Sequence, residues 1–390
     1  MFALFRNRLF SADVLGHFAV DTLNSSVAVL LVILAGPLEL SNSQIATVIG
    51  VQIFVGALSQ PLFGLLGDRV RGRPAVLAGV GLLWMAIFLT LAALAQEYDR
   101  ILLFVGLMAL GSGLFHPIGT VTASAAHPAR AALATSIFFF GGQTGLAVGP
   151  TIGGALMQHY GGAAALVPVC ALAVIPALLL IFAPGPAGVA RTVRRAGSAA
   201  LKIAPLIILA FVLLVALRSS VQSVYTSFLP KLFADRGWEP ARYGAITGTF
   251  IFAAAIGGVV TGELADRRGM RFATVWPLLI CVPLGLVCIT SASVPLTFVA
   301  AALFGATAGG QHSILVVHAQ RLLPVRDVFA AGLILGFTFA SGGLGTWAAG
   351  PLADQFGLPL VMEGATLLAI PAALLGLTLP GAPAAERVVA

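Results

Sequence analysis

The chain has 390 residues, of which 59% are hydrophobic and only 9% are charged, and its formal net charge is +7. Soluble domains carry about 25% charged residues, and a water-soluble globule of this size could not cover its surface with so few. The composition therefore predicts a multi-pass membrane protein and excludes secreted, disordered and nucleic-acid-binding proteins. The three cysteines lie in apolar runs without pairing or ligand spacing, so neither disulfides nor a cysteine metal site is expected.

A membrane-spanning helix needs roughly 20 mostly apolar residues, and apolar runs of that length recur twelve times. We expect helices over residues 12–36, 44–67, 75–96, 100–125, 132–157, 163–183, 204–230, 242–264, 272–292, 295–319, 328–351 and 359–380. The fold class is thus an all-α membrane protein with twelve transmembrane helices. Residues 1–183 form the predicted N-terminal six-helix bundle, 184–203 a basic, cytoplasmic linker and 204–390 the C-terminal six-helix bundle.

Basic residues gather on one predicted side of the membrane. The side with more basic residues carries Arg6, Arg8, Arg69, Arg71, Arg73, Arg130, Arg191, Arg194, Arg195, Lys202, Arg267, Arg268, Arg271, Arg321, Arg326 and Arg387. The other side carries Arg100, Lys231, Arg236 and Arg242. Because cytoplasmic loops are enriched in Lys and Arg, both termini are expected in the cytoplasm of an inner (plasma) membrane. The positive charge is then a topology signal, with some attraction to anionic lipid.

Polar residues share one face of the first predicted helix, because Asp13, His17, Asp21 and Asn24 are spaced by four, four and three residues. Asp13 lies near the predicted cytoplasmic end, where solvent could reach it. An ionisable group deeper in a span is costly and usually faces a cavity or a partner. Asp21 is therefore the predicted proton-binding residue, His17 is expected to share its proton, and Asn24 is assigned to the substrate site. The alternative is a structural hydrogen-bonded pair that does not titrate.

The fourth and tenth predicted helices carry polar residues at matching positions. Residues 113–116 read Gly-Leu-Phe-His, and residues 309–312 read Gly-Gly-Gln-His. We assign four residues to the lining of a substrate cavity: His116, Gln143, Gln311 and His312. For each histidine, an interhelical hydrogen bond is the alternative.

The fifth predicted helix carries glycine at every fourth position from Gly141 to Gly153, followed by Gly154. This spacing stacks the glycines on one helix face, where another helix can approach closely. Pro150 lies inside the same run and is expected to bend the helix.

The seventh predicted helix places Arg218, Gln222 and Tyr225 on one face, at spacings of four and three. Arg218 is the basic residue that falls inside a predicted span. A guanidinium group suits phosphonate and carboxylate groups, so we assign all three residues to substrate binding. Arg218 could also be a counter-charge to Asp21, and an interhelical salt bridge is the structural alternative.

The two halves of the chain repeat each other. The stretch Gly-x-Leu-Ala-Asp-Arg-x-Gly-x-Arg at 262–271 resembles the loop signature of the major facilitator superfamily, and 64–73 resembles a copy with one extra residue. Further stretches resemble the fosmidomycin-resistance branch of that superfamily: residues 17–21, 60–64, 115–117, 136–142, 319–324 and 342–345. The resemblance covers nearly the whole chain. It implies a secondary transporter with two pseudo-symmetric six-helix bundles that rock about a central cavity.

The resemblance also implies roles for two motifs. A conformational latch between helix pairs would be formed by Asp68, Arg69, Arg73, Asp266, Arg267 and Arg271. A charged loop that only fixes the orientation is the alternative. The run Gly145, Gly149, Pro150, Gly153 and Gly154 resembles the antiporter signature of drug/proton exchangers, with Ser136 where a glycine is usual. Here the alternative is tight packing that any helix bundle needs.

The chain lacks the sequence motifs of zinc proteases, serine hydrolases and nucleotide-binding loops. We therefore expect neither an enzyme nor an ATP-driven pump, and no metal or other cofactor. The expected function is that of a monomeric, proton-coupled antiporter that exports small amphipathic or anionic compounds, with fosmidomycin-like phosphonates as the substrate that the resemblance implies. A proton-coupled importer of a sugar or other small metabolite is the second candidate. A non-transporting scaffold or receptor is the third, although it would need neither Asp21 nor Arg218 inside a span.

Overall fold

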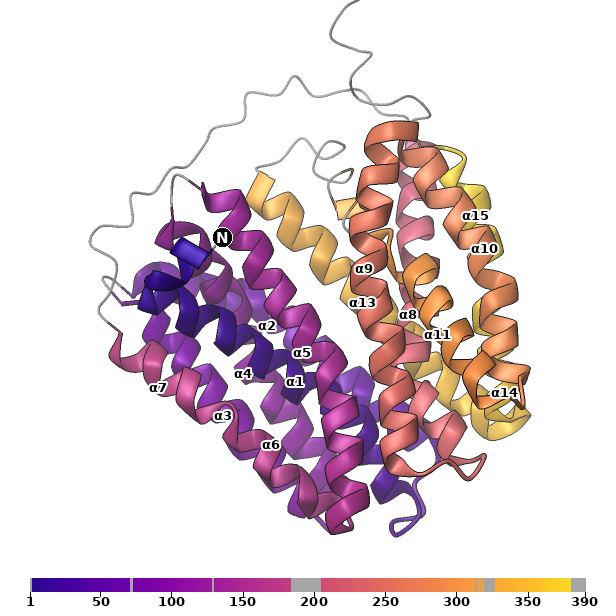
Figure 1. Ribbon diagram of the computed structural model, residues 1–390, viewed down its shortest axis with the longest axis horizontal. Coiled ribbons are helices and arrows are strands. Elements are labelled where there is room, and N and C mark those ends of the chain that lie inside the picture. Colours follow the sequence, from indigo (N-terminus) through magenta and orange to yellow (C-terminus); the bar gives the residue numbers. More distant parts are fainter. Residues whose placement is uncertain are drawn as a thin grey trace, which may run out of the picture. The chain divides into compact units, whose positions relative to one another are not determined.

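The computed structural model describes residues 2–70, 73–127, 130–183, 205–312, 314–316, 318 and 327–379. The described residues form helices and no strands. The elements in chain order are η1 (Phe2–Arg6), α1 (Arg8–Ala35), α2 (Asn42–Arg69), α3 (Ala75–Leu94), α4 (Tyr98–Ala126), α5 (Ala131–Tyr160), η3 (Ala163–Leu166), α6 (Val167–Ala171), α7 (Val174–Phe182), α8 (Pro205–Ala234), α9 (Pro240–Arg268), α10 (Met270–Thr290), α11 (Val294–Gly309), α13 (Asp327–Phe356), α14 (Leu358–Leu367) and α15 (Ala369–Gly376) (Figure 1).

These elements give twelve membrane spans. Among the described residues, ten stretches are long and apolar enough to cross a bilayer, including η3 to α7 as the sixth span and α14 with α15 as the last. The other two spans are α5 and α13, each 30 residues long. A helix of that length rises about 45 Å, which exceeds the ~30 Å hydrocarbon layer. The expected twelve-helix membrane fold is confirmed.

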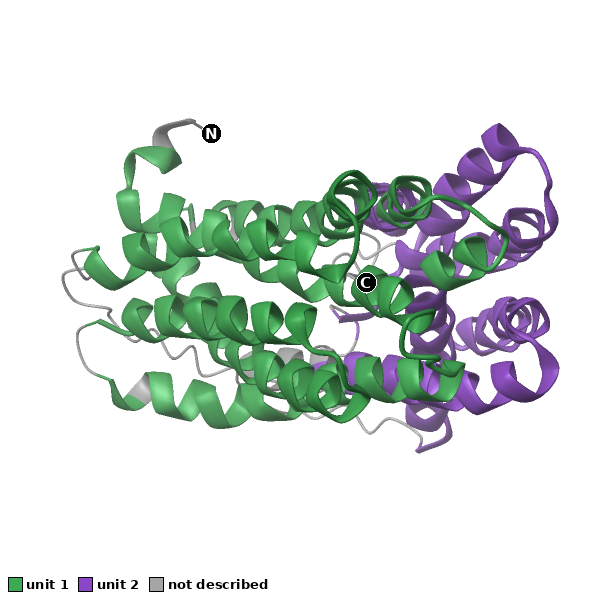
Figure 2. Ribbon diagram, turned by 90° about the horizontal axis from the view of Figure 1, so that it is seen from below, with its two compact units in different colours: residues 1–192, 229–248 green, residues 193–228, 249–390 purple. Residues whose placement is uncertain are grey.

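The chain divides into two compact units (Figure 2). The first comprises Met1–Thr192 with Leu229–Gly248, and the second comprises Val193–Phe228 with Thr249–Ala390. The predicted linker at 184–203 lies outside the described residues, so the domain boundary stays a prediction. The stretch 319–324, which supports the resemblance, also lies outside them.

In the first unit, α1 is the central helix. It packs against α3, α4, α5 and α7, and 20 of its 28 residues are buried. Because α1 is enclosed by other helices, its polar residues meet protein groups rather than lipid.

Glycines of α5 allow the closest of these contacts. A Cβ atom on Gly145 would lie 2.2 Å from the carbonyl oxygen of Phe18, and one on Gly149 would lie 2.4 Å from that of Thr22. Real Cβ atoms do not approach other atoms so closely, so only glycine lets the two helix backbones meet here. Pro150 follows inside α5.

The next two glycines of the α5 motif face other neighbours. A Cβ atom on Gly153 would lie 3.2 Å from the side chain of Leu166, and one on Gly154 would lie 2.3 Å from the carbonyl oxygen of Pro240, within the first unit. The motif therefore makes close helix contacts on more than one face of α5.

Asp13 is fully buried, and neither carboxylate oxygen has a hydrogen-bond partner among the described residues. The prediction that solvent reaches it is wrong. Helix α1 begins at Arg8, five residues earlier, and other helices cover Asp13: a Cβ atom on Gly119 of α4 would lie 3.0 Å from its Oδ1 atom.

In the second unit, α10 packs against α11, α14 and α15. Aromatic rings join α8, α9 and α11, because Tyr225 lies 4.2 Å from Phe304 and 5.8 Å from Phe250 between ring centroids. This aromatic cluster is part of the buried core of the unit.

Candidate functional site

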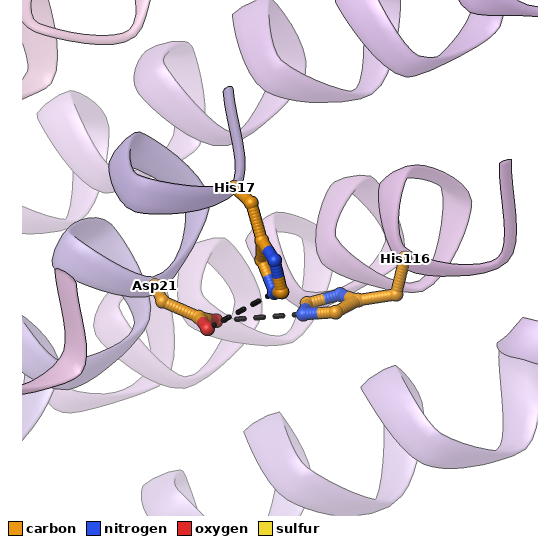
Figure 3. Close-up of side chains that lie close together, drawn as sticks. All are labelled: His17, Asp21 and His116. Atoms are coloured by element: carbon orange, nitrogen blue, oxygen red, sulfur yellow. Dashed lines mark ion pairs between the residues drawn. The ribbon is translucent and has the colours of Figure 1, made fainter. Parts of the chain in front are cut away.

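Three ionisable side chains meet inside the first unit: His17 and Asp21 of α1, and His116 of α4 (Figure 3). The Nε2 atom of His17 lies 3.3 Å from Asp21 Oδ2, and the Nε2 atom of His116 lies 3.4 Å from Asp21 Oδ1. We call these three residues the His–Asp–His centre. The side chains of His17 and Asp21 are almost inaccessible, whereas that of His116 is 23% exposed. Sequence spacing predicted the neighbours on α1, and the structure adds His116, which we had assigned to the substrate cavity.

The backbone of α5 forms one wall of the centre. A Cβ atom on Gly142 would lie 2.5 Å from His17 Nε2 and 2.6 Å from Asp21 Oδ2. The absence of a side chain at this position therefore leaves room for the imidazole and carboxylate groups to meet.

Replacing Gly142 by Ala is expected to displace His17 and Asp21 and to destabilise the protein by about 1–3 kcal/mol, the usual cost of an added atom in a packed interior. The thermal unfolding midpoint of the purified protein measures this effect. Gly336→Ala is the matched control, because a Cβ atom on that helical glycine meets nothing within 4 Å. Equal unfolding midpoints for the two variants would contradict the proposed packing.

Backbone carbonyl groups set the orientation of both imidazole rings. The Nδ1 atom of His17 lies 2.8 Å from the carbonyl oxygen of Phe138, and that of His116 lies 2.8 Å from the carbonyl oxygen of Ser112. A carbonyl oxygen only accepts, so we infer that Nδ1 carries the hydrogen in both rings. In the neutral rings the unprotonated Nε2 atoms then face the Asp21 carboxylate. A cation between these acceptors, whether a proton or a metal ion, would relieve their mutual repulsion.

A polar network extends from the centre to α2. Asn24 donates to Asp21 Oδ1 at 3.4 Å and to Ser112 Oγ at 3.0 Å, and Gln52 donates to the carbonyl oxygen of Asn24 at 3.0 Å. Asn24 thus supports the Asp21 carboxylate. Ser112 and Gln52 were not among the predicted site residues. Ser112 could have been found because it precedes His116 by one helical turn, whereas Gln52 carries no comparable signal.

Apolar rings surround His17. Phe138 stacks on its imidazole with a centroid distance of 4.0 Å, and Phe139 and Phe115 lie at 5.8 and 6.0 Å. A dry, apolar environment strengthens electrostatic interactions between the groups it encloses. One ligand atom from each residue of the His–Asp–His centre lies within 4.8 Å of the other two, so the same side chains also have the donor set of a metal site.

Arg218 is buried in the second unit and donates hydrogen bonds to the C-terminal end of α11. It donates from Nε to the carbonyl oxygen of Ala308 at 3.3 Å, from Nη2 to that of Gly309 at 2.7 Å, and to Gln222 Oε1. These carbonyls belong to the last helical turn, which has no partners within its own helix. No carboxylate in the described part of the chain pairs with Arg218. The interhelical salt bridge considered for it is therefore replaced by hydrogen bonds to the backbone.

Tyr225 is fully buried in the same unit. Its hydroxyl group lies 2.5 Å from Thr366 Oγ1 and donates to the carbonyl oxygen of Gly285 at 3.4 Å. These contacts link α8 to α10 and α14, which is a packing role. The predicted contact of Tyr225 with substrate stays a prediction.

Three other residues were predicted to line the substrate cavity. Gln311 is buried and donates to the carbonyl oxygen of Thr307, while its Oε1 atom has no partner among the described residues. His312 lies 6.4 Å from the ring of Phe339 between centroids, and Gln143 is exposed on α5. Their roles in substrate binding stay predictions.

Two arginines of the repeated loop make equivalent contacts in the two halves. Arg73 donates to the carbonyl oxygens of Ile181 and Ala183, at 2.5 and 3.0 Å, where α7 ends. Arg271 donates to the carbonyl oxygen of Leu379 at 2.9 Å, just after α15. Each arginine thus binds the free carbonyl end of the last span in its half.

The other residues of the predicted latch make fewer contacts than Arg73 and Arg271. Arg267 pairs with Glu263 at 2.5 Å on the exposed surface of α9, and Asp266 and Arg69 are exposed. The side chain of Asp68 lies outside the described residues. The latch therefore stays a prediction for these residues.

Comparison with known proteins places the chain among transporters. The model of the Major Facilitator Superfamily matches residues 14–327 and 211–389. The chain is 29% identical to the fosmidomycin resistance protein of Escherichia coli (strain K12) over 361 residues, which cover 90% of this chain and 87% of that protein. It is also 29% identical to the uncharacterized MFS-type transporter YfnC of Bacillus subtilis (strain 168), with 91% and 88% coverage.

Solved structures show the same fold. A bacterial homolog to the human lysosomal transporter Spinster, in an inward-facing and occupied conformation, matches with a TM-score of 0.76 and 18% identity over 93% of this chain and 95% of that one. The nucleoside transporter NupG matches with a TM-score of 0.75 and 14% identity over 94% and 98%. At these identities the likeness establishes the arrangement of helices and nothing about the substrate.

Proposed function

This chain belongs to the major facilitator superfamily, and on that premise we propose that it is a proton-coupled antiporter that exports small amphipathic or anionic compounds. The chain is a multi-pass membrane protein, and its relatives are transporters rather than enzymes. The proposal adds the coupling ion, the direction of transport and the substrate class. It also adds a bacterial inner membrane, cytoplasmic termini and a monomeric state.

The observation that carries the coupling proposal is the His–Asp–His centre. Ionisable residues within a membrane span are rare and mark proton or substrate paths. Here three of them converge, with Nε2 of His17 and of His116 turned toward the Asp21 carboxylate. Each proton added to this site bridges two acceptors that otherwise repel.

The number of protons bound to the His–Asp–His centre sets its charge. Without an added proton the centre carries the single negative charge of Asp21, one proton neutralises it, and a second makes it positive. A change of a whole charge in an apolar interior shifts a conformational equilibrium when the two conformations solvate the charge differently. The partly exposed ring of His116 is the route by which we propose that protons enter.

The substrate part of the proposal rests on Arg218 and on the relatives. Arg218 is a buried cation without a carboxylate partner among the described residues. A bound anion would supply the missing negative charge, and phosphonate and carboxylate groups fit a guanidinium group well. A relative that carries the name fosmidomycin resistance protein supports phosphonates of this kind as substrates.

In the proposed cycle, the charge of the His–Asp–His centre controls the binding of substrate at Arg218. In the outward-open state the centre binds a proton, which lowers the affinity for substrate and permits the return of the empty carrier. In the inward-open state the proton leaves and an anionic or amphipathic compound binds. We include Asp68, Arg69, Asp266 and Arg267 as a latch between access states, with Arg73 and Arg271 securing the last span of each half.

Inverted membrane vesicles with an acid interior test the proposal. Addition of fosmidomycin outside is expected to release protons from the lumen, because substrate enters as protons leave, and a pH-sensitive dye reports the change. Vesicles that lack the protein are the control. Movement of protons and fosmidomycin in the same direction would instead support the importer. Absence of flux with a broad panel of compounds would support the scaffold or receptor.

A further inference from the structure

We propose that the His–Asp–His centre also binds one divalent transition-metal ion, such as Zn²⁺, through Nε2 of His17, Nε2 of His116 and the carboxylate of Asp21. The ion occupies the position that protons occupy in the proposed function and therefore competes with them. A bound ion holds the centre in one charge state and inhibits coupled transport. The inhibition rests on the proposed function, whereas the binding does not.

The donor set and the distances suit such an ion. Two imidazole nitrogens and one carboxylate oxygen are the protein ligands of zinc sites that keep a fourth position open. With zinc–ligand bonds of about 2.0–2.1 Å, two ligands of a tetrahedral ion lie roughly 3.3–3.4 Å apart. The two nitrogen–oxygen distances in the centre are 3.3 and 3.4 Å, each to a different oxygen of the carboxylate. One ligand atom of each residue lies within 4.8 Å of the other two, so side-chain rotations that turn both histidines toward one carboxylate oxygen bring three ligand atoms around one ion.

The surroundings hold the ligands as they are held in known metal sites. A histidine ligand usually donates its other ring N–H to a carbonyl or carboxylate oxygen, which fixes the ring and its tautomer. Both histidines of the centre do this, with Nδ1 at 2.8 Å from the carbonyl oxygens of Phe138 and Ser112. Asn24 donates to Asp21 Oδ1 and orients the carboxylate. Both imidazole ligands are therefore oriented before any ion arrives.

An ion satisfies the centre more completely than one proton does. A single proton joins one Nε2 atom to the carboxylate and leaves the other Nε2 atom facing an acceptor without a donor. A divalent ion binds all three atoms at once, and its charge outweighs that of the one carboxylate. Because the site is enclosed by apolar rings, this electrostatic gain is larger than it would be in water.

The structure also provides a path to the site. The side chain of His116 is 23% exposed, against 9% for Asp21 and 3% for His17. We therefore expect an ion to approach past His116, where water or an oxygen atom of a ligand would complete its coordination. The rings of Phe138 and Phe115 cover His17 from other directions.

Titration of the purified full-length protein with Co²⁺ in detergent tests the proposal, because tetrahedral Co²⁺ absorbs visible light and reports its ligands. We expect one Co²⁺ per chain, displaced by Zn²⁺. His116→Gln and Asp21→Asn are expected to weaken binding by more than about 100-fold, since even the loss of a supporting hydrogen bond costs 10–100-fold. His159→Gln is the matched control, because His159 is an exposed histidine at the end of α5, outside the centre.

Failure of Co²⁺ to bind the wild-type protein, or equal binding by His116→Gln, would overturn the proposal. X-ray absorption spectroscopy of the zinc-loaded wild-type protein is a second test that needs no variant. We expect two imidazole ligands and oxygen ligands. Sulfur ligands would instead assign the ion to the cysteines and would also overturn the proposal. Neither measurement needs transport. Cobalt binding without proton-coupled flux would refute the proposed function alone, and coupled flux without cobalt binding would refute the metal site alone.

Discussion

Replacement of Asp21 by Asn is expected to abolish proton-driven accumulation of fosmidomycin while the protein still folds and inserts. Asn has nearly the shape of Asp, still accepts a hydrogen bond from Asn24, and donates to one histidine, but it does not bind a proton. The pair of His17 and His116 then lacks the carboxylate that bridges it. We expect proton-driven flux to fall by roughly 100-fold or more, the usual loss when a proton-transfer group is removed.

The measurement is fosmidomycin accumulation in proteoliposomes with and without a pH gradient. Exchange of labelled for unlabelled fosmidomycin at equal pH is expected to continue, because it does not require a proton to move. Asp99→Asn is the matched control, since Asp99 is an exposed carboxyl group at the start of α4. Gradient-driven accumulation at the wild-type level in Asp21→Asn would contradict the role of Asp21.

Replacement of Arg218 by Ala is expected to destabilise the second unit by about 2–6 kcal/mol, because each buried acceptor left without a donor costs about 1–3 kcal/mol. The change removes the hydrogen bonds that Arg218 donates to Ala308, Gly309 and Gln222. The carbonyl groups of Ala308 and Gly309 are then buried without this partner. The thermal unfolding midpoint in detergent measures the loss. Arg236→Ala is the control, because Arg236 is exposed, and we expect a change of at most about 0.5 kcal/mol. A similar unfolding midpoint for both variants would show that the hydrogen bonds of Arg218 to α11 do not stabilise the protein.

Arg218→Lys separates structural support from substrate binding. Lys keeps the positive charge and can donate to one carbonyl group, so most of the stability is expected to remain. It lacks the paired donors of guanidinium, and the loss of one charge-assisted hydrogen bond of about 1.5 kcal/mol predicts about tenfold weaker fosmidomycin binding. Unchanged affinity in this folded variant would exclude Arg218 as a bidentate anion site.

Local periodicity accounts for what the sequence predicts well. The twelve spans follow from apolar length, and the proximity of His17 to Asp21 follows from their spacing on one helix. The contact of Arg218 with Gln222 follows from the same spacing. These features need no knowledge of how helices pack.

Tertiary packing accounts for what the sequence does not predict. His116 joins Asp21 only because α4 lies beside α1, and Gly142 makes room only because α5 lies against both residues. Asp13 was expected near solvent, yet α4 covers it. A pattern on one helix does not reveal which face a neighbour covers, so such features require the three-dimensional structure.

Proton release on substrate binding tests most directly the claim that the His–Asp–His centre couples protons to substrate. Purified protein in weakly buffered detergent solution is mixed with fosmidomycin, and a pH indicator records any proton that leaves. The account predicts release by the wild-type protein in proportion to the fraction bound, and none by Asp21→Asn. Binding of fosmidomycin to the wild-type protein with no proton released at any pH between about 5 and 8, the range in which histidine changes charge, would contradict it.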